Sequence, residues 1–208
     1  LLVLSPGFVF LTLFLSPDKS LASPGAMDNL SGIAQNMMIA KHYAENPNEL
    51  PDNCRLIALA FGCEEAGLKG SMAFVKQHKN DGLLDNAYVI NIDSVSDGDY
   101  FEVVMGDIMQ LTRFDQGMID MGYESLKEAG LIRKTGKIYN PIGGCDSTPF
   151  AKIGVPTVTI AAQNPVPTTY YHTKDDKPGR LSKEVFAEGI KASHILIKKI
   201  CDKEAAKK

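Results

Sequence analysis

The stretch that decides the fold runs from Leu56 to Glu65 and reads LIALAFGCEE. Its first six residues are apolar, and its last two are adjacent carboxylates. A continuous apolar run that ends in a polar turn predicts a strand buried on both faces, as in an α/β sheet. Ligands of such sheets bind at the carboxyl ends of the strands. The sequence therefore places Glu64 and Glu65 where chemistry is expected.

The paired glutamates Glu64 and Glu65 allow two interpretations. Adjacent side chains diverge, so one carboxylate could hold a metal ion while its neighbour handles a proton. Acidic residues are also common at the N-termini of helices, where the macrodipole favours them. For an isolated pair of glutamates the helix-end interpretation is the more frequent one, and the rest of the chain has to decide.

The composition is that of a globular protein, which we expect to form a single domain over residues 1–208. The formal net charge of −3 argues against a nucleic-acid partner and against an anionic membrane surface, because both attract basic proteins. The four cysteines are irregularly spaced, which indicates neither a zinc ribbon nor a dense disulfide framework. The sequence makes no prediction about the oligomeric state.

The first sixteen residues are almost wholly apolar. They lack the basic segment and the cleavage site of a signal peptide. A Ser-Pro-Gly turn at residues 5–7 interrupts them before they reach the about 20 residues of a membrane-spanning helix. We expect two strands here, at residues 1–4 and 8–15, and a cytoplasmic or secreted protein. Because the chain begins without Met and directly in a predicted strand, upstream sequence is expected to be missing.

Predicted strands and helices alternate along the rest of the chain. Further strands are predicted at residues 87–92, 100–105 and 155–161, and helices at about 30–45, 71–79, 109–129 and 182–201. This alternation predicts an α/β fold with three layers, in which helices flank both faces of a mixed, mostly parallel, twisted sheet.

Four acids and one histidine stand at the ends of separate predicted elements. They are Asp28, Glu64, Glu65, Asp93 and His172. Carboxylate and imidazole ligands together suit zinc, or in some settings manganese or cobalt. A two-metal site needs one bridging carboxylate and terminal ligands on each side. Taken alone, Asp28 would be interpreted as the N-cap of the helix that follows it.

Several motifs occur in the order of one family. They are GAMDNLSG at 25–32, FGCEEAGLKGS at 61–71, NIDS at 91–94, DSTPF at 146–150 and YHT at 171–173. The chain resembles the co-catalytic zinc aminopeptidases of the bacterial leucyl aminopeptidase and aminopeptidase Y type, in peptidase clan MH. That clan also includes glutamate carboxypeptidases, glutaminyl cyclases and the transferrin-receptor ectodomain. The resemblance covers residues 24–176 and implies a zinc exopeptidase-like fold.

The resemblance implies a set of metal ligands. Asp28 would bridge two zinc ions. Glu65 and His172 would complete one of the two metal sites, and Asp93 would bind the other metal ion.

The resemblance also implies roles beside the metal. Glu64 would be the general acid and base. The peptide bond between Asp28 and Asn29 would be cis. Tyr171, next to the histidine ligand, is a candidate for contact with the substrate.

The sequence departs from the family at one ligand. The family carries a further histidine, in a His-x-Asp motif, at the end of the strand before the GAMDNLSG run. Phe14 or Ser16 occupies that position here, so the second metal ion would keep two carboxylates and no imidazole. We therefore expect one firmly held zinc ion, a second bound weakly or not at all, and impaired activity. The other histidines, His42, His78 and His194, accompany neither a carboxylate partner nor a strand end in the sequence and are expected to be surface or packing residues.

The sequence thus predicts a zinc metallopeptidase, an aminopeptidase that hydrolyses N-terminal residues from peptide substrates. Two alternatives stay open. One is a mono-zinc acyltransferase similar to glutaminyl cyclases, and the other is a non-catalytic family member with a degenerate metal site. The number of zinc ions bound per chain distinguishes the three.

Overall fold

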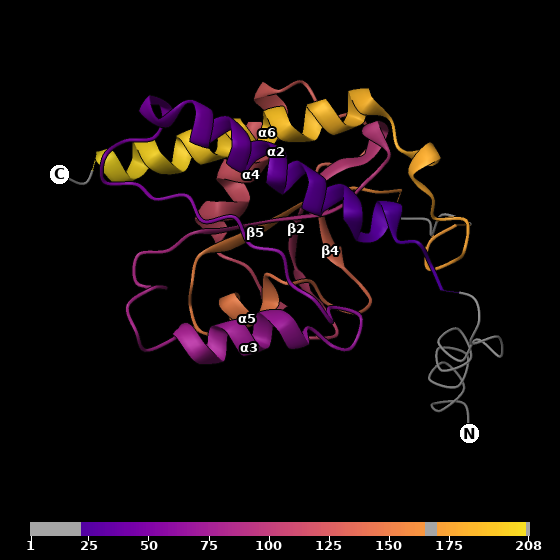
Figure 1. Ribbon diagram of the computed structural model, residues 1–208, viewed down its shortest axis with the longest axis horizontal. Coiled ribbons are helices and arrows are strands. Elements are labelled where there is room, and N and C mark those ends of the chain that lie inside the picture. Colours follow the sequence, from indigo (N-terminus) through magenta and orange to yellow (C-terminus); the bar gives the residue numbers. More distant parts are fainter. Residues whose placement is uncertain (1–21, 165–169, 207–208) are drawn as a thin grey trace.

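The computed structural model describes residues 22–164 and 170–206 (Figure 1). Within these residues one sheet contains β1 Val89–Val95, β2 Phe101–Asp107, β3 Thr112–Arg113, β4 Lys137–Asn140 and β5 Thr157–Ala162. The strand order is β1-β5-β2-β3, and β4 also pairs with β2. The β1–β5 and β2–β4 pairs are parallel, whereas β5–β2 and β2–β3 are antiparallel. The predicted α/β fold with a mixed sheet is confirmed.

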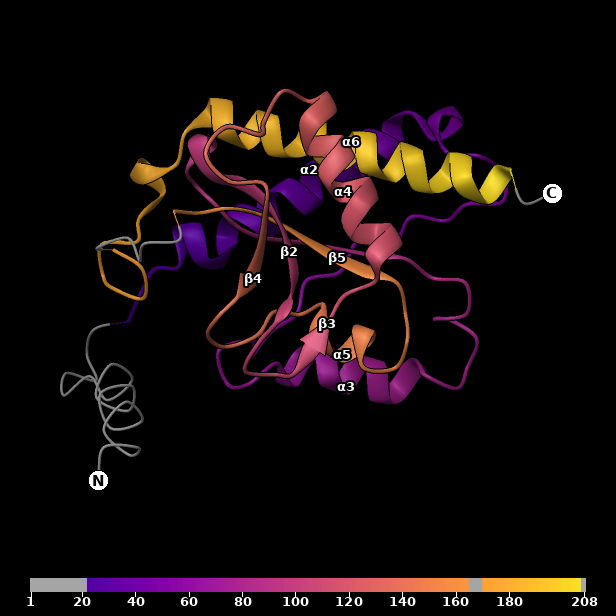
Figure 2. The same ribbon diagram turned by 180° about the vertical axis from the view of Figure 1, so that it is seen from behind.

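Helices cover both faces of this sheet (Figure 1 and Figure 2). One face carries α2 Ser31–Glu45, α4 Gln116–Glu128 and α6 Lys183–Ala205, and the other carries α3 Lys69–His78 and α5 Thr148–Ala151. In the described part of the chain, four short turns of helix connect the elements: η1 Ala26–Leu30, η2 Pro47–Glu49, η3 Gly98–Tyr100 and η4 Pro178–Arg180. The molecule therefore has the three layers that the sequence predicts.

The main core lies between the sheet and the helices α4 and α6. Strand β5 is buried along its whole length, as expected for an apolar strand in the middle of a sheet. Val103, Ile160, Leu126 and Leu196 from four elements are each fully buried there. Burying one such side chain contributes about 1.5–3 kcal/mol, so this contact fixes the sheet against its helical layer.

The long helix predicted at residues 109–129 begins later than expected. Residues Thr112 and Arg113 form strand β3, which pairs antiparallel with the end of β2. The first residues of the predicted helix therefore belong to a β-hairpin. Helix α4 starts only after Asp115, whose side chain accepts a hydrogen bond of 2.8 Å from the N–H of Met118. Asp115 is thus the N-cap, and the prediction was wrong for residues 109–115.

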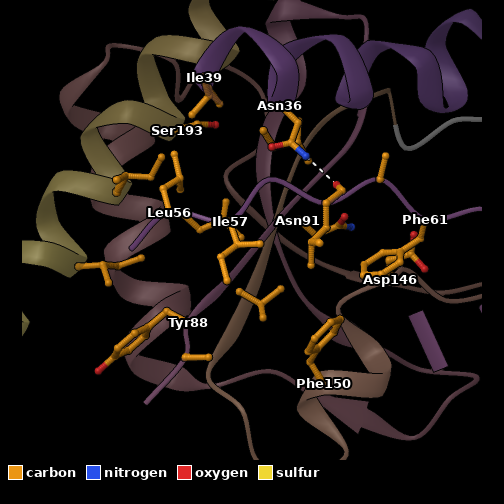
Figure 3. Close-up of a pocket in the computed structure, with 18 of the residues that line it drawn as sticks. Asn36, Ile39, Leu56, Ile57, Phe61, Tyr88, Asn91, Asp146, Phe150 and Ser193 are labelled. Atoms are coloured by element: carbon orange, nitrogen blue, oxygen red, sulfur yellow. Dashed lines mark hydrogen bonds between the residues drawn. The ribbon is translucent and has the colours of Figure 1, made fainter. Parts of the chain in front are cut away.

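The apolar stretch Leu56–Phe61, predicted to be a buried strand, belongs to no strand in the described part of the chain. Ile57 is 45% exposed and Leu59 is 36% exposed. The side chain of Asn36 in α2 donates a hydrogen bond of 2.6 Å to the Leu59 carbonyl (Figure 3). A strand needs a hydrogen-bonded neighbour, and among the described residues none lies beside this stretch. The strand prediction was therefore wrong here, while the strands predicted at residues 1–4 and 8–15 lie outside the described residues.

All four cysteines lie in the described part of the chain and are free thiols. The helices of that part include none with both the length and the apolar character needed to cross a bilayer.

Candidate metal centre

Asp28 lies in the short turn η1, just before α2 begins. Its backbone leaves helical geometry, with φ −117° and ψ 90°, and the predicted cis peptide bond to Asn29 is present. The buried carboxylate of Asp176 accepts hydrogen bonds from the N–H groups of Met27 at 2.8 Å and Asp28 at 3.2 Å. Asp176 therefore holds the turn, and the Asp28 side chain faces the other acids instead of capping the helix.

Asn29 ties the start of α2 to the end of β1. Its side-chain oxygen accepts hydrogen bonds from the N–H groups of Gly32 at 2.9 Å and Ser94 at 3.2 Å. Its side-chain nitrogen donates to the carbonyl of Ile92 at 2.9 Å. A Cβ atom at Gly32 would overlap that same carbonyl oxygen, so the close approach of α2 to β1 requires glycine at this position.

Three of the predicted ligands converge. The Nε2 atom of His172 lies 2.9 Å from an oxygen of Asp28 and 3.1 Å from an oxygen of Glu65. One ligand atom from each of the three side chains lies within 4.8 Å of the other two. Hydrogen bonds to Asp28 and Glu65 raise the pKa of His172 to about 10. Two carboxylates and one imidazole are donors that zinc accepts, so the residues present fit that ion.

Glu64 and Asp93 border this group of three. Burial, together with the neighbouring negative charges, raises the pKa of Glu64 to about 8 and that of Asp93 to about 7. Asp93 lies near the carboxyl end of β1, as predicted, and accepts a hydrogen bond of 3.1 Å from the Ser94 hydroxyl. Carboxylates crowded in this way favour either protons or a divalent cation between them.

Tyr171 stacks on His172, with the ring centroids 3.9 Å apart. Burial and the nearby carboxylates, Asp28 first among them, hold the pKa of Tyr171 well above its usual value. The hydroxyl therefore stays protonated and can act as a hydrogen-bond donor beside the acids.

Two hollows meet at the acids. A cavity of about 890 Å³ runs from the acids along β1, between that strand and residues 54–61. In Figure 3, Phe61 and Asp146 lie at one end of it, and Leu56 and Tyr88 lie toward the other. A second hollow of about 330 Å³ is lined by His172 together with residues near Asp28 and by Glu65. Two acids line both hollows, namely Asp28 and Glu65.

Two acids that support the site were not singled out from the sequence. One is Asp176, described above, for which no sequence pattern gives a signal. The other is Asp107, fully buried at the end of β2, which accepts hydrogen bonds from the Cys145 N–H at 3.1 Å, from the Asn140 side chain at 3.0 Å and from the Thr148 hydroxyl. Asp107 thus fixes the loop that carries Asp146 into the cavity. The strand-end rule that found Asp93 could have found it.

The fold resembles several solved structures. BSAP, a zinc aminopeptidase from Bacillus subtilis, matches with a TM-score of 0.70 and 21% identity over 85% of this chain and 42% of that one. LapB from Legionella pneumophila matches with a TM-score of 0.70 and 22% identity over 84% and 47% of the two chains. A glutaminyl cyclase from an Acidobacteriales bacterium matches with a TM-score of 0.63 and 19% identity over 86% and 63%. At these identities the likeness shows the fold alone.

The chain spans less than half the length of BSAP from Bacillus subtilis and of LapB from Legionella pneumophila. Among curated protein sequences no match is found. The model of peptidase family M28 matches residues 14–194, which is most of the sequence. The chain therefore belongs to peptidase family M28.

Proposed function

We propose that the chain is a zinc-dependent metallopeptidase, and specifically an aminopeptidase that removes N-terminal residues from peptides. The observation that supports this proposal is the convergence of Asp28, Glu65 and His172, with Glu64 directly beside them, in a chain of family M28. Solved structures with the same fold include a zinc aminopeptidase, which agrees with the proposal.

Asp28, Glu65 and His172 would hold the first zinc ion. Three protein ligands leave a position open for water or substrate, as in catalytic zinc sites. When bound, zinc supplies a Lewis acid that polarises the scissile carbonyl and activates a water molecule. Asp28 and Asp93 would hold a second zinc ion weakly, because two carboxylates without an imidazole are fewer ligands than zinc sites usually have.

Glu64 would act as the general base and acid. It would take a proton from the attacking water and pass it to the leaving amine. Without metal, burial and its acidic neighbours raise the pKa of Glu64 to about 8, so that the carboxyl keeps its proton at neutral pH. A divalent cation beside it offsets the negative charges and lowers that pKa, which frees the carboxylate to accept a proton. The Tyr171 hydroxyl, next to His172, is placed to contact the substrate.

The test is hydrolysis of aminoacyl p-nitroanilides by the zinc-loaded protein. Glu64→Gln should leave the zinc content unchanged and lower turnover by about 10²–10⁴-fold. Glu124→Gln is a matched control, because Glu124 lies on the exposed face of α4 and pairs only loosely with Lys127, at 3.9 Å. A Glu64→Gln protein with parental turnover would refute the role of Glu64. A zinc-loaded parent that hydrolyses no aminoacyl substrate would refute the aminopeptidase proposal.

A glutaminyl-cyclase-like acyl transfer is the second candidate. The ligand group contains a single imidazole, which suits one zinc ion, and the cyclase with the same fold is matched over 63% of its length. A peptide with N-terminal glutamine separates the two activities. Cyclisation releases ammonia, whereas hydrolysis releases free glutamine. A folded chain that binds no zinc at Asp28, Glu65 and His172 and does neither would support the non-catalytic alternative with a degenerate metal site.

A further inference from the structure

A second cluster of metal-ligating side chains lies far from the acids, on the α2–α6 face. His42 belongs to the last turn of α2, Glu49 to the short turn η2, and His194 to α6. One ligand atom from each lies within 4.8 Å of the other two. His42 is eleven residues beyond Ser31, the first residue of α2, which at 1.5 Å per residue is roughly 16 Å along the helix axis.

The turn after α2 brings Glu49 back over His42. Asn46 ends the helix, because its N–H and its side-chain nitrogen each donate to the His42 carbonyl at 2.9 Å. The N–H of Glu49 donates to the carbonyl of Asn46 at 3.0 Å, which closes the turn η2. As a result, an oxygen of Glu49 lies 2.9 Å from Nε2 of His42. Local structure alone therefore sets up the first two ligands.

Helix α6 supplies the third ligand in a fixed orientation. Nδ1 of His194 is hydrogen-bonded at 3.0 Å to the hydroxyl of Tyr43, and the two rings are stacked. Tyr43 is only 5% exposed and packs with Ile39 and Ile197 between the two helices. This arrangement turns Nε2 of His194 toward Glu49, at 3.8 Å from the same carboxylate oxygen. Metal-binding histidines usually have their other ring nitrogen held by a hydrogen bond in this way.

The distances between the imidazole nitrogens and the Glu49 oxygen are close to those between ligand atoms that share one metal ion. Ligand atoms about 2.0–2.1 Å from a tetrahedral zinc ion lie about 3.3 Å apart. The two distances to Glu49, 2.9 Å and 3.8 Å, lie on either side of this value. All three side chains are partly exposed, with 37–44% of each side chain accessible, so they can adjust without disturbing the core.

A simple surface ion pair between His42 and Glu49 does not account for the presence of His194 beside the same carboxylate. His78 and Asp81 show what such a pair looks like, with one imidazole 2.7 Å from one carboxylate and no further ligand. Exposed pairs of this kind contribute about 0–1 kcal/mol. In the cluster two imidazoles, with ring centroids 5.2 Å apart, face the same carboxylate, and two imidazolium ions so close would repel each other. A divalent cation uses both imidazoles in their neutral form.

We propose that His42, Glu49 and His194 form a second transition-metal site, which binds zinc or a similar ion and joins the end of α2 to α6. Two imidazoles and one carboxylate select zinc, cobalt or nickel over calcium and magnesium, which prefer oxygen ligands. Lys198, which also lies near Glu49, is a cation that opposes metal binding, so the affinity should be lower than at a site without such a neighbour. The site is independent of the proposed peptidase activity.

The experiment uses His172→Ala as the parent chain, so that the first metal centre is disabled. Calorimetry should show one zinc equivalent bound, and cobalt should give the visible absorption of a protein-bound ion. His42→Gln and His194→Gln, each added to this parent, should weaken binding by at least about tenfold, in line with the 10–100-fold cost of losing even an indirect partner of a metal. His78→Gln is the matched control, because it removes an exposed histidine from an ordinary ion pair, and it should bind zinc like the parent.

Zinc should also raise the unfolding temperature of the His172→Ala parent, and not that of the His42→Gln and His194→Gln variants. Circular dichroism in EDTA establishes that each variant folds. Glu49→Gln keeps both histidines and should likewise weaken zinc binding. It replaces a histidine variant in this test if that variant fails to fold. The proposal is overturned if the parent binds no zinc at about 100 μM, or if zinc binding is the same with and without these three side chains.

Discussion

Zinc binding to Asp28, Glu65 and His172 should displace a proton and therefore strengthen steeply with pH. In the metal-free protein the pKa of His172 is raised to about 10, because Nε2 is hydrogen-bonded to Asp28 at 2.9 Å and lies 3.1 Å from Glu65. The imidazole thus keeps a proton on both nitrogens throughout the neutral range. Zinc can take Nε2 only when that proton leaves.

The sign and size of the effect follow from this pKa. A higher pH favours the deprotonated imidazole that binds zinc, so the apparent association constant should rise about tenfold per pH unit below pH 10. Between pH 6.5 and pH 8 the rise is about 30-fold, whereas an imidazole with the usual pKa of about 6.5 would give only about twofold. Glu64 and Asp93, whose pKa values are also raised, can only add to the slope, because the cation favours their ionised forms.

The association constant is measured by competition with a chelator of known affinity at a series of pH values. Calorimetry in buffers with different ionisation enthalpies counts the released protons directly. The His42→Gln background weakens binding at the second cluster by at least about tenfold, so that the first site dominates the signal. A rise of only about twofold between pH 6.5 and pH 8, or release of fewer than half a proton, would refute the reasoning, because His172 would then not be held as an imidazolium ion.

Three further predictions concern the same site. His172→Ala, made in the His42→Gln background, should lose zinc on dialysis, because the group of three has no other imidazole, and undiminished zinc would make this histidine a plain loop residue. Histidine at Phe14 or Ser16 should add a second firmly bound zinc ion and raise activity, whereas two tight equivalents in a chain without either change, measured with the second cluster removed, would show that another residue already fills the role. Gly32→Ala should lower the free energy of unfolding by about 1–3 kcal/mol in urea, since the new methyl group overlaps the β1 backbone. Gly179→Ala, with open space at that position, is its control, and equal stabilities of the two variants would contradict the overlap.

The elements that the sequence predicted well carry their own signal. Strand β5 is a run of β-branched and small residues, and it lies in the middle of the sheet, where both of its faces are buried. Helix α6 starts after Ser182, whose hydroxyl accepts hydrogen bonds from the N–H groups of Glu184 and Val185, as an N-cap residue does. In both cases local pattern and tertiary environment agree, so reasoning from the pattern was sufficient.

The failures have the opposite cause. Residues 56–61 have the composition of a buried strand, but burial and pairing depend on a neighbour that composition cannot supply. Strand β4 was missed because its four residues alternate between exposed and partly buried positions and form no apolar run. The apolar pattern of α4 extends toward the N-terminus beyond Asp115, although Asp115 is itself an N-cap signal for a later start of the helix. The first two errors lie where tertiary contacts outweigh local preference, whereas the third goes against a local signal.

The site residues likewise fall into those that the sequence indicates and those that it does not. Polar residues at the ends of predicted elements indicated Asp93 and the group of Asp28, Glu65 and His172, and the fold brings these three together. This pattern could not identify Asp176, because a buried carboxylate that accepts backbone N–H groups looks in the sequence like any surface aspartate. The pattern also favours carboxylates, and for that reason His42 and His194 were assigned to surface or packing roles, although the fold brings them to one carboxylate.

The two clusters differ in what their surroundings allow. Around the group formed by Asp28, Glu65 and His172, further carboxylates line a cavity of about 890 Å³, so a bound metal ion would have a proton acceptor and room for a substrate beside it. The cluster of His42 and His194 uses its one carboxylate as a ligand, and its three members do not line that cavity. No carboxylate of this cluster is left over to accept a proton. A metal ion there can hold two helices together, but hydrolysis needs a base and room for a substrate, and of these two clusters of described residues only the first has both beside it.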